Sequence, residues 1–410
     1  MWFAQAGICW CDLDKTGTMH ETTPVFVESA QMTDPLVALR HDLHRHPDLS
    51  GQEGATARRV GAYIEQTNPA QVIERLGGHG VAVVYHGTHE GPTVLFRAEL
   101  DALPIQERSV AAHRSVRDGV AHLCGHDGHM AILAGLGESL RNHPPVSGRV
   151  ILLFQPAEET GEGARAVLAD PRFDALRPDW AFALHNMPGV APGHVAVAAG
   201  PAACASVGLR VCLQGREAHA AQPETGQSPA PVVQDLLEWV QAFQGAHGRK
   251  DGCLATLCHL NMGQPAFGIS PAQAEIWITL RAITDCALEQ LEGQLRDLVA
   301  QRASLCGLAV QISRRDHFNA SINDPDAAAI VARAAAGLGM PAGDFSLPMR
   351  ASEDFGAFST VTRTALFFLG AGETVPSLHN PDYDFPDALI APAVRLFRSI
   401  LDDCLHAQGG

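Results

Sequence analysis

The sequence lacks the marks of several protein classes. It has no Lys/Arg-rich run, its formal net charge is −16 and its pI is about 5.6, so a basic surface for nucleic acid is not expected. No apolar run approaches the roughly 18 residues that a membrane span needs. Residues 1–31 have neither the basic start nor the apolar core of a signal peptide. We expect them to form a disordered extension, with Met32 as a candidate start, and we expect a cytoplasmic protein.

Further absences restrict the chemistry. The sequence has no G-x-S-x-G motif, so the nucleophile elbow of many serine hydrolases is missing. Its 10 cysteines lack the spacing of a disulfide framework, which favours a reduced setting. With 410 residues, of which 46% are hydrophobic, the chain is globular and too long for one ordinary core. We therefore expect two domains.

Short apolar runs alternate with helical patterns through much of the chain. A helix is expected at 129–144, where a proline ends the pattern. Fully apolar strands separated by helices are typical of a parallel sheet that is covered on both faces. The fold class is therefore α/β, with a mostly parallel sheet and helices on both of its faces. Its strands are expected at 80–87, 93–102, 149–159, 179–189 and 364–372.

The pattern changes between residues 203 and 314. The order of expected elements there is β-α-β-β-α-β, which is the split arrangement of a ferredoxin-like α+β unit. We expect this segment to be an inserted domain. Residues 32–202 and 315–410 would then form one interrupted domain on either side of it.

The densest group of metal-binding side chains lies in "HLCGHDGHM", residues 122–130. It contains His122, Cys124, His126, Asp127 and His129. The segment could be a polar loop that begins a helix, with Asp127 as its cap. However, sulfur, nitrogen and oxygen donors without a second C-x2-C pair do not suit a closed structural zinc site. The mixture favours two metals with open positions for a substrate.

Acids and histidines follow several of the expected strands. Open α/β sheets bind ligands at the carboxyl ends of their strands, so these side chains should meet at one edge. The adjacent Glu158 and Glu159 suggest a division of work, in which one binds metal and the other takes a proton from a water molecule. An exposed acidic turn is the alternative. The side chains concerned are Glu99, Asp101, Glu158, Glu159, His185, Glu373 and His379.

Seven segments together resemble the M20 metallopeptidase family. They are "RAELDALPIQE", "CGHDGH", "QPAEETGEGA", "ALHNMPG", "GREAHAAQPETG", "ASEDFGAF" and "SLHNPDYDF". The resemblance covers roughly residues 36–405 and is closest to the amidohydrolase branch, which includes hippurate hydrolases and auxin-amino-acid conjugate hydrolases. It implies a fold like that of the di-zinc exopeptidases, in which the inserted domain serves as a lid and for dimerisation, as a dimer or a dimer of dimers. It also implies hydrolysis of N-acyl amino acids with an apolar or aromatic acyl group.

The same resemblance assigns roles to residues of this sequence. Glu158 would be the general base, and Asp101 would orient a ligand histidine. His219 would reach across a dimer to the scissile carbonyl, and Arg281 would hold the substrate carboxylate. The alternatives are an ordinary loop histidine and an arginine on a sheet surface. The ligands of two divalent ions, Mn, Zn, Co or Ni, would be Cys124, His126, Glu159, His185 and His379.

Some positions depart from the family pattern. Glu99 stands where the family usually has Asp, Glu224 where it often has His, and Ser228 where it often has Asp, while "FGISP" replaces the usual "NVIP". We expect Glu224 to make the substrate pocket more acidic. Two alternatives to the N-acyl amino acid substrate use the same site, a dipeptide or an aromatic amine. A non-catalytic metal-dependent binding protein would have no need of Glu158.

Overall fold

The computed structural model describes residues 34–243 and 252–406, and the predicted extension at 1–31 lies outside them. Its larger sheet has the strand order β1-β2-β4-β3-β5-β15-β6. The central strands β4, β3, β5 and β15 are parallel, whereas β1, β2 and β6 pair antiparallel at the edges. The bounds are β1 Gln71–Leu76, β2 Gly80–His86, β3 His89–Glu99, β4 Ser147–Gln155, β5 Trp180–Pro188, β6 Val195–Ala196 and β15 Arg363–Gly372.

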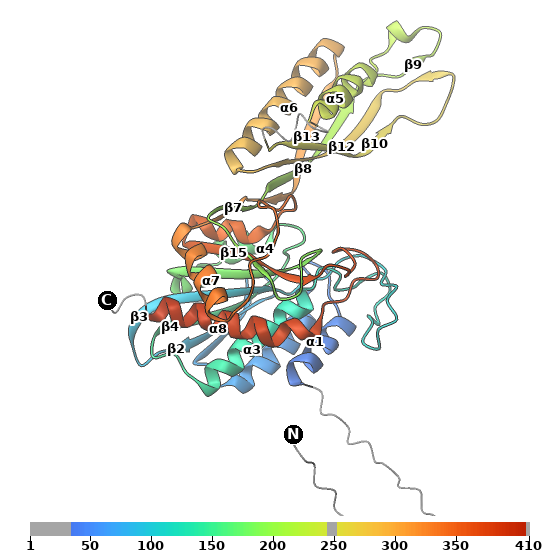
Figure 1. The fold of residues 1–410 in the computed structure, drawn as a ribbon. Helices are drawn as coiled ribbons and strands as arrows, with labels where there is room; N and C mark the ends of the chain where they lie inside the picture. Colours follow the sequence, from blue (N-terminus) through green and yellow to red (C-terminus); the bar gives the residue numbers. More distant parts are fainter. Residues whose placement is uncertain (1–33, 244–251, 407–410) are drawn as a thin grey trace, which may run out of the picture. The chain divides into compact units, whose positions relative to one another are not determined.

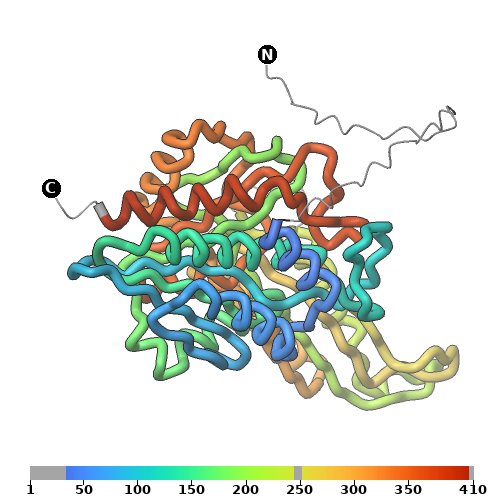
Figure 2. Tube along the Cα trace, turned by 90° about the horizontal axis from the view of Figure 1, so that it is seen from below, coloured from blue at the N-terminus to red at the C-terminus, as the bar shows by residue number. Residues whose placement is uncertain are grey.

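Helices cover both faces of this sheet, as predicted. Apolar residues of α1 (Pro35–Arg45), α2 (Gly54–Ile64), α3 (His126–Asn142), α7 (Pro325–Gly337) and α8 (Ile390–His406) pack with inward residues of the central strands in one core. Residues of α4 (Gly163–Ala169) and the short turns η2 (Pro171–Leu176) and η4 (Asp354–Thr360) form the core of the other face. Figures 1 and 2 show α3 and α8 side by side beneath the sheet.

Helix α3 begins earlier than the sequence pattern predicts. It starts at His126, not at residue 129, because Gly125 adopts a left-handed conformation with φ 91° and turns the chain into the helix. Consequently His126 and Asp127 lie in the first helical turn, directly above the edge of the sheet.

A second sheet is built from residues 205–318. Its strand order is β10-β12-β8-β13, and all pairings are antiparallel. The inward side chains of this sheet share a separate core with α5 (Ala230–Ala242) and α6 (Asp285–Cys306). Along the chain the order is β-α-β-β-α-β, as expected, while the division into domains stays a prediction. The strands are β8 Ala205–Gln214, β10 Leu254–Met262, β12 Gln273–Ala282 and β13 Ala309–Phe318.

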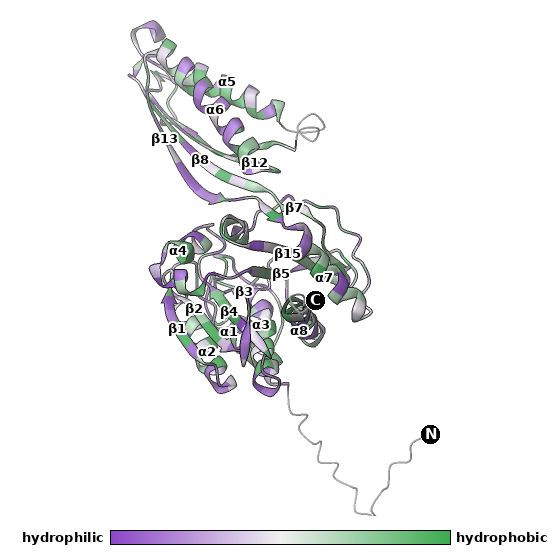
Figure 3. Cartoon of the chain, turned by 90° about the vertical axis from the view of Figure 1, so that its left-hand side faces the viewer, coloured by the Kyte–Doolittle hydropathy of each residue, from purple (hydrophilic) through white to green (hydrophobic). Residues whose placement is uncertain are grey.

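The edge strand β13 is strongly polar, and Figure 3 draws it largely in the hydrophilic colour. Charged side chains on an edge strand oppose pairing with another chain. The remaining short strands are β7 Gly200–Ala203, β9 Ala218–His219, β11 Ile269–Ser270 and β14 Ser321–Asn323, with the turns η1 Glu65–Thr67, η3 Pro223–Thr225 and η5 Asp387–Leu389. Within 34–243 and 252–406, we find no helix with the length and apolar character that a membrane span requires.

Candidate metal centre

The four parallel strands end at one edge of the larger sheet, and the predicted site residues gather there. Glu158 and Glu159 follow β4, and Asp101 follows β3. His185 lies near the end of β5, and His379 follows β15. Segments far apart in the sequence therefore bring their acids and histidines to one place.

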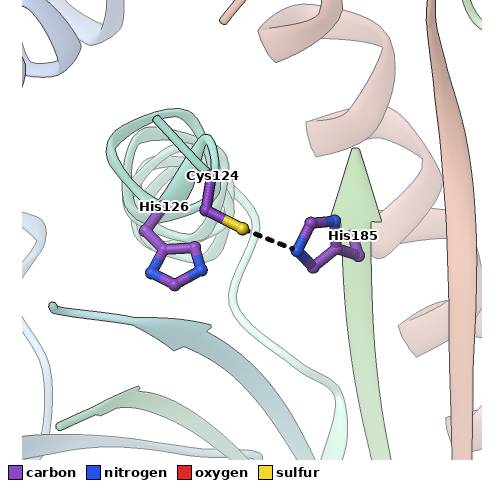
Figure 4. A group of neighbouring side chains, drawn as sticks. All are labelled: Cys124, His126 and His185. Carbon is purple, nitrogen blue, oxygen red and sulfur yellow. Dashed lines mark hydrogen bonds between the residues drawn. The ribbon is translucent and has the colours of Figure 1, made fainter. Parts of the chain in front are cut away.

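Of the groups of three potential metal ligands at this edge, two contain Cys124. Cys124, His126 and His185 form one group, and Cys124, Glu159 and His379 form the other. Within each group the donor atoms lie within 4.8 Å of one another, and the Cys124 thiol belongs to both. Figure 4 shows the first group, in which Cys124 Sγ lies 3.5 Å from His185 Nε2. Together the two groups contain the five predicted ligands.

Both histidines of the first group present Nε2 to the site. The Nδ1 atom of His126 lies 2.8 Å from the carbonyl oxygen of Asp101, and that of His185 lies 2.8 Å from the carbonyl oxygen of Asn186. A carbonyl can only accept, so each Nδ1 carries a hydrogen, and each Nε2 is the ring nitrogen left to face the site. His126 Nε2 and Glu159 Oε1 are buried without a hydrogen-bond partner among the described residues. Buried nitrogen and oxygen atoms without a hydrogen-bond partner are suited to bind a cation.

The electrostatics of the centre also favour cations. Burial, together with the charge of Glu159, raises the pKa of the Cys124 thiol well above its ordinary value. Burial and the neighbouring Glu353 likewise raise the pKa of Glu158. Burial raises the pKa of Glu159 to about 7 against the attraction of His126. The pKa values of all three acids are therefore raised, because their negative charges would be buried close together. Bound divalent ions would lower these pKa values by compensating the negative charge.

Asp101 connects two of the predicted ligands. Its backbone carbonyl orients His126, and its Oδ2 atom accepts hydrogen bonds from the backbone N–H of Glu159 at 2.9 Å and from the Ser50 hydroxyl at 2.7 Å. The sequence predicted that Asp101 orients a ligand histidine. In the structure the backbone carbonyl of Asp101 contacts His126, while its carboxylate accepts the hydrogen bond from the backbone N–H of Glu159.

Asn186 positions the cysteine. Its Nδ2 group donates to the carbonyl of Cys124 at 2.8 Å, and the Tyr383 hydroxyl donates to its Oδ1 atom. A Cβ on Gly125 would lie only 2.3 Å from that Oδ1 atom, so glycine is required here both for space and for its positive φ. Asn186 was not predicted as a site residue, although the motif "ALHNMPG" contained it.

Two other members of the histidine-rich segment have different partners. His129 is close enough to Glu99 and His126 to form a third donor group. However, its Nδ1 lies 2.7 Å from Glu99 Oε2, and its Nε2 accepts the N–H of Asn186 at 3.1 Å. Because both ring nitrogens are engaged, His129 positions its neighbours. His122 is buried, and neither of its ring nitrogens has a partner among the described residues.

Asp127 faces away from the centre toward helix α1. Its Oδ2 atom lies 2.9 Å from His44 Nδ1 and 3.3 Å from Arg40 Nη1. Arg40 also pairs with Asp384 at 2.6 Å and with Asp387 at 2.8 Å. The network therefore ties the first turn of α3, which carries His126, to the segment that follows His379.

A buried arginine balances the acids behind the site. Arg97 forms ion pairs with Glu99, with Glu353 at 2.8 Å and with Asp354 at 2.6 Å. Glu158, Glu353 and Asp354 themselves form a further group of close carboxylates. Sequence reasoning missed Arg97, because only the fold reveals that two of its partners, Glu353 and Asp354, come from a segment more than 250 residues away.

A cavity of about 420 Å³ opens onto the centre, lined by the predicted ligands other than His126, by Glu158, and by Arg281 from β12. Arg281 Nη1 donates to Ser352 Oγ at 2.8 Å.

His219 on β9 and Glu224 in η3 are exposed and lie outside the lining formed by the described residues of the same chain. Glu224 therefore does not line this cavity in the single chain, and its effect on the substrate pocket stays a prediction. Glu224 lies in η3, which follows β9 of the short β9–β11 ribbon, and the sequence pattern did not predict that ribbon.

Comparison with known proteins agrees with this geometry. The model of peptidase family M20/M25/M40 matches residues 95–403. Hippurate hydrolase of Campylobacter jejuni is 28% identical over 365 residues, which cover 88% of this chain and 94% of that protein. N-acetyl-L-cysteine deacetylase of Bacillus subtilis is 34% identical over 225 residues, 55% of this chain and 53% of that protein.

Among solved structures, the YxeP protein of Bacillus subtilis is described as a dinuclear metal-binding peptidase of the M20 family. It shares the fold with a TM-score of 0.77 and 24% identity, over 90% of this chain and 97% of that one. The predicted fold class, the amidohydrolase branch and the enzyme class, a hydrolase of linear amides, are confirmed. The chain belongs to peptidase family M20/M25/M40.

Proposed function

We propose that the protein hydrolyses the amide bond of N-acyl amino acids that carry an apolar or aromatic acyl group. The observation that carries this proposal is the pair of donor groups that share Cys124, with Glu158 beside them and Arg281 in the same cavity. The names of the relatives, a hippurate hydrolase and a deacetylase, support the same class of substrate.

The five ligands Cys124, His126, Glu159, His185 and His379 would hold two divalent ions of the Mn, Zn, Co or Ni type. When bound, such ions supply Lewis acidity, which polarises a carbonyl and lowers the pKa of a water molecule. Asp101 keeps His126 and Glu159 in place for them.

Glu158 is the proton carrier in this proposal. Its carboxylate lies 3.8 Å from His126 Nε2 and lines the cavity. It takes a proton from the attacking water and passes it to the nitrogen of the leaving amino acid. Arg281 binds the carboxylate of that amino acid, since a guanidinium matches a carboxylate in geometry and charge.

His219 completes the proposed site from a second copy of the chain. It is exposed on β9 and lies away from the cavity of its own chain. A partner's histidine in that position would donate a hydrogen bond to the carbonyl oxygen as negative charge develops on it. This proposal requires a dimer or a dimer of dimers, and we place the enzyme in the cytoplasm.

The test combines metal analysis with a substrate panel. The purified chain is expected to hold two ions and to hydrolyse N-benzoylglycine, with activity lost to a chelator and restored by Mn or Zn. Two ions without turnover of any N-acyl amino acid would favour a dipeptide or an aromatic amine as the substrate. No bound metal would overturn the proposal.

The role of Glu158 is tested by Glu158→Gln. Metal content should be retained while kcat falls by about 10²- to 10⁴-fold, the usual contribution of a general base. Glu162→Gln is the matched control, because Glu162 is exposed four positions away and its side chain makes no capping hydrogen bond. Full activity of the Glu158→Gln enzyme would refute this role.

A further inference from the structure

The proposed general base, Glu158, follows a strained position of the backbone. Ala157, directly before it, has a φ of 50°, in the left-handed region that residues other than glycine rarely adopt. Strand β4 ends at Gln155, so Ala157 lies in the turn that leads from the sheet to the two adjacent glutamates. A conformation of this kind persists only where the surrounding structure holds it.

A buried carboxylate holds this turn. Glu53, the residue before helix α2, is fully buried. Its Oε1 atom accepts hydrogen bonds from the backbone N–H of Ala157 at 2.8 Å and from the backbone N–H of Gly51 at 2.7 Å. A single oxygen atom therefore connects the loop before α2 to the turn after β4, which lies 104 positions farther along the chain.

Stability alone does not explain why a carboxylate is buried at this position. Among the described residues, Glu53 contacts no cation, and its Oε2 atom has no hydrogen-bond partner. Burial, with a contribution from the charge of Asp101, raises the pKa of Glu53. Burying such a group without a partner costs free energy. The feature that its contacts do explain is the conformation of Ala157.

The backbone is held on both sides of Glu158. The N–H of the preceding residue, Ala157, bonds to Glu53. The N–H of the following residue, Glu159, bonds to Asp101 Oδ2 at 2.9 Å. Because the main chain is fixed before and after Glu158, the direction in which its carboxylate leaves the backbone is fixed as well.

We propose that Glu53 is a positioning residue for the general base, which holds Ala157 in its left-handed conformation and so directs the Glu158 carboxylate toward the attacking water. Glu53 is not among the described residues that line the cavity, so it acts through the backbone and not on the substrate. The inference rests on the proposed function for the role of Glu158.

The kinetic test compares Glu53→Ala with Glu53→Gln on N-benzoylglycine. Glutamine keeps an oxygen atom that can accept from both N–H groups, whereas alanine does not. Glu53→Ala should lower kcat about 10- to 100-fold, because a small misplacement of a catalytic group has an effect of this size. Its KM and metal content should stay close to those of the wild type, and Glu53→Gln should retain most of the wild-type kcat.

Glu138→Ala is the matched control, because Glu138 accepts a hydrogen bond from Tyr63 of α2 at 2.6 Å and its loss affects stability alone. An unchanged kcat in Glu53→Ala, or an equal fall in Glu53→Gln, would overturn the proposal. Loss of metal in Glu53→Ala would also overturn it, since the ligand Glu159 would then be the group that Glu53 supports. If Glu53→Ala does not fold, Glu53→Asp gives the same comparison, because its shorter side chain cannot reach both N–H groups.

Hydrogen exchange at the Ala157 amide, followed by NMR in the full-length protein, tests the contact without any reaction. Exchange should be about ten-fold faster in Glu53→Ala, the effect of one lost hydrogen bond, and close to the wild-type rate in Glu53→Gln. Equal acceleration of all amides would indicate a loss of global stability and would overturn the proposal. A wild type that hydrolyses no N-acyl amino acid would refute the proposed function, whereas an Ala157 amide that does not respond to Glu53→Ala would refute this inference.

Discussion

Replacing Arg40 with methionine tests whether the buried network behind α3 stabilises the protein. Arg40 has 1% of its side chain exposed and Asp127 has none, so their pair at 3.3 Å is shielded from solvent. Its other partners, Asp384 and Asp387, are about one-third exposed, at 33% and 34%, and solvent screens them in part. Methionine retains most of the packing volume but leaves these carboxylates without their shared cation.

The size of the effect follows from this burial. Breaking a buried pair by removing one partner costs about 3–5 kcal/mol. Because His44 still lies 2.9 Å from Asp127, we expect Arg40→Met to fall at the lower end, about 3 kcal/mol. At roughly 2 °C per kcal/mol for a large domain, the melting temperature should fall by about 6 °C.

The assay is thermal and urea unfolding at pH 7, with Arg45→Met as the control. Arg45 is exposed on the same helix and its guanidinium donates to the carbonyl of Ala112, so its replacement should cost less than about 0.5 kcal/mol. A loss of less than about 1 kcal/mol in Arg40→Met would refute the reasoning.

Two further predictions concern the same region. Asp101→Asn should lower metal affinity about 10- to 100-fold, because an uncharged side chain accepts the hydrogen bonds from Ser50 and Glu159 less strongly. Competition with a chelating dye measures this affinity, and an unchanged affinity would contradict the role of Asp101. Burial alone would lower the pKa of His44, but Asp127 raises it from 6.5 to about 10. A raised pKa stabilises the fold at low pH, so the advantage of the wild type over His44→Gln should be full below about pH 6.5 and should disappear as the pH rises through 10. Urea unfolding across this range measures the difference, and a constant difference would contradict the predicted protonation.

The sequence predicts the candidate metal ligands better than it predicts the groups that hold those ligands in position. Cys124 and Glu159 are expected because parallel strands end at one edge and because the motifs are specific together. The use of the Asp101 carbonyl in place of its carboxylate could not be predicted, since it depends on the path of the backbone after β3. Similarly, the contact of His44 with Asp127 joins residues 83 positions apart, so no local pattern predicts it.

The edges of the fold were also beyond prediction. Apolar runs indicate strands but not their direction, so the antiparallel pairing of β1, β2 and β6 around the parallel centre emerges only from the structure. The exposed position of Glu224 has the same origin, because the short ribbon of β9 and β11 has no periodic signal of its own.

Because Cys124 belongs to both donor groups, modification of its thiol should inactivate the enzyme. A thiol can be oxidised or alkylated, whereas a carboxylate in the same position could not. One modified sulfur atom would remove a donor from both groups at once, so the capacity to bind metal should be lost in a single event and not gradually. Cys124 as a whole residue is 7% exposed, which limits access by reagents, and bound ions would shield its thiol further. Storage without metal and under air is therefore expected to be the condition that this protein tolerates least.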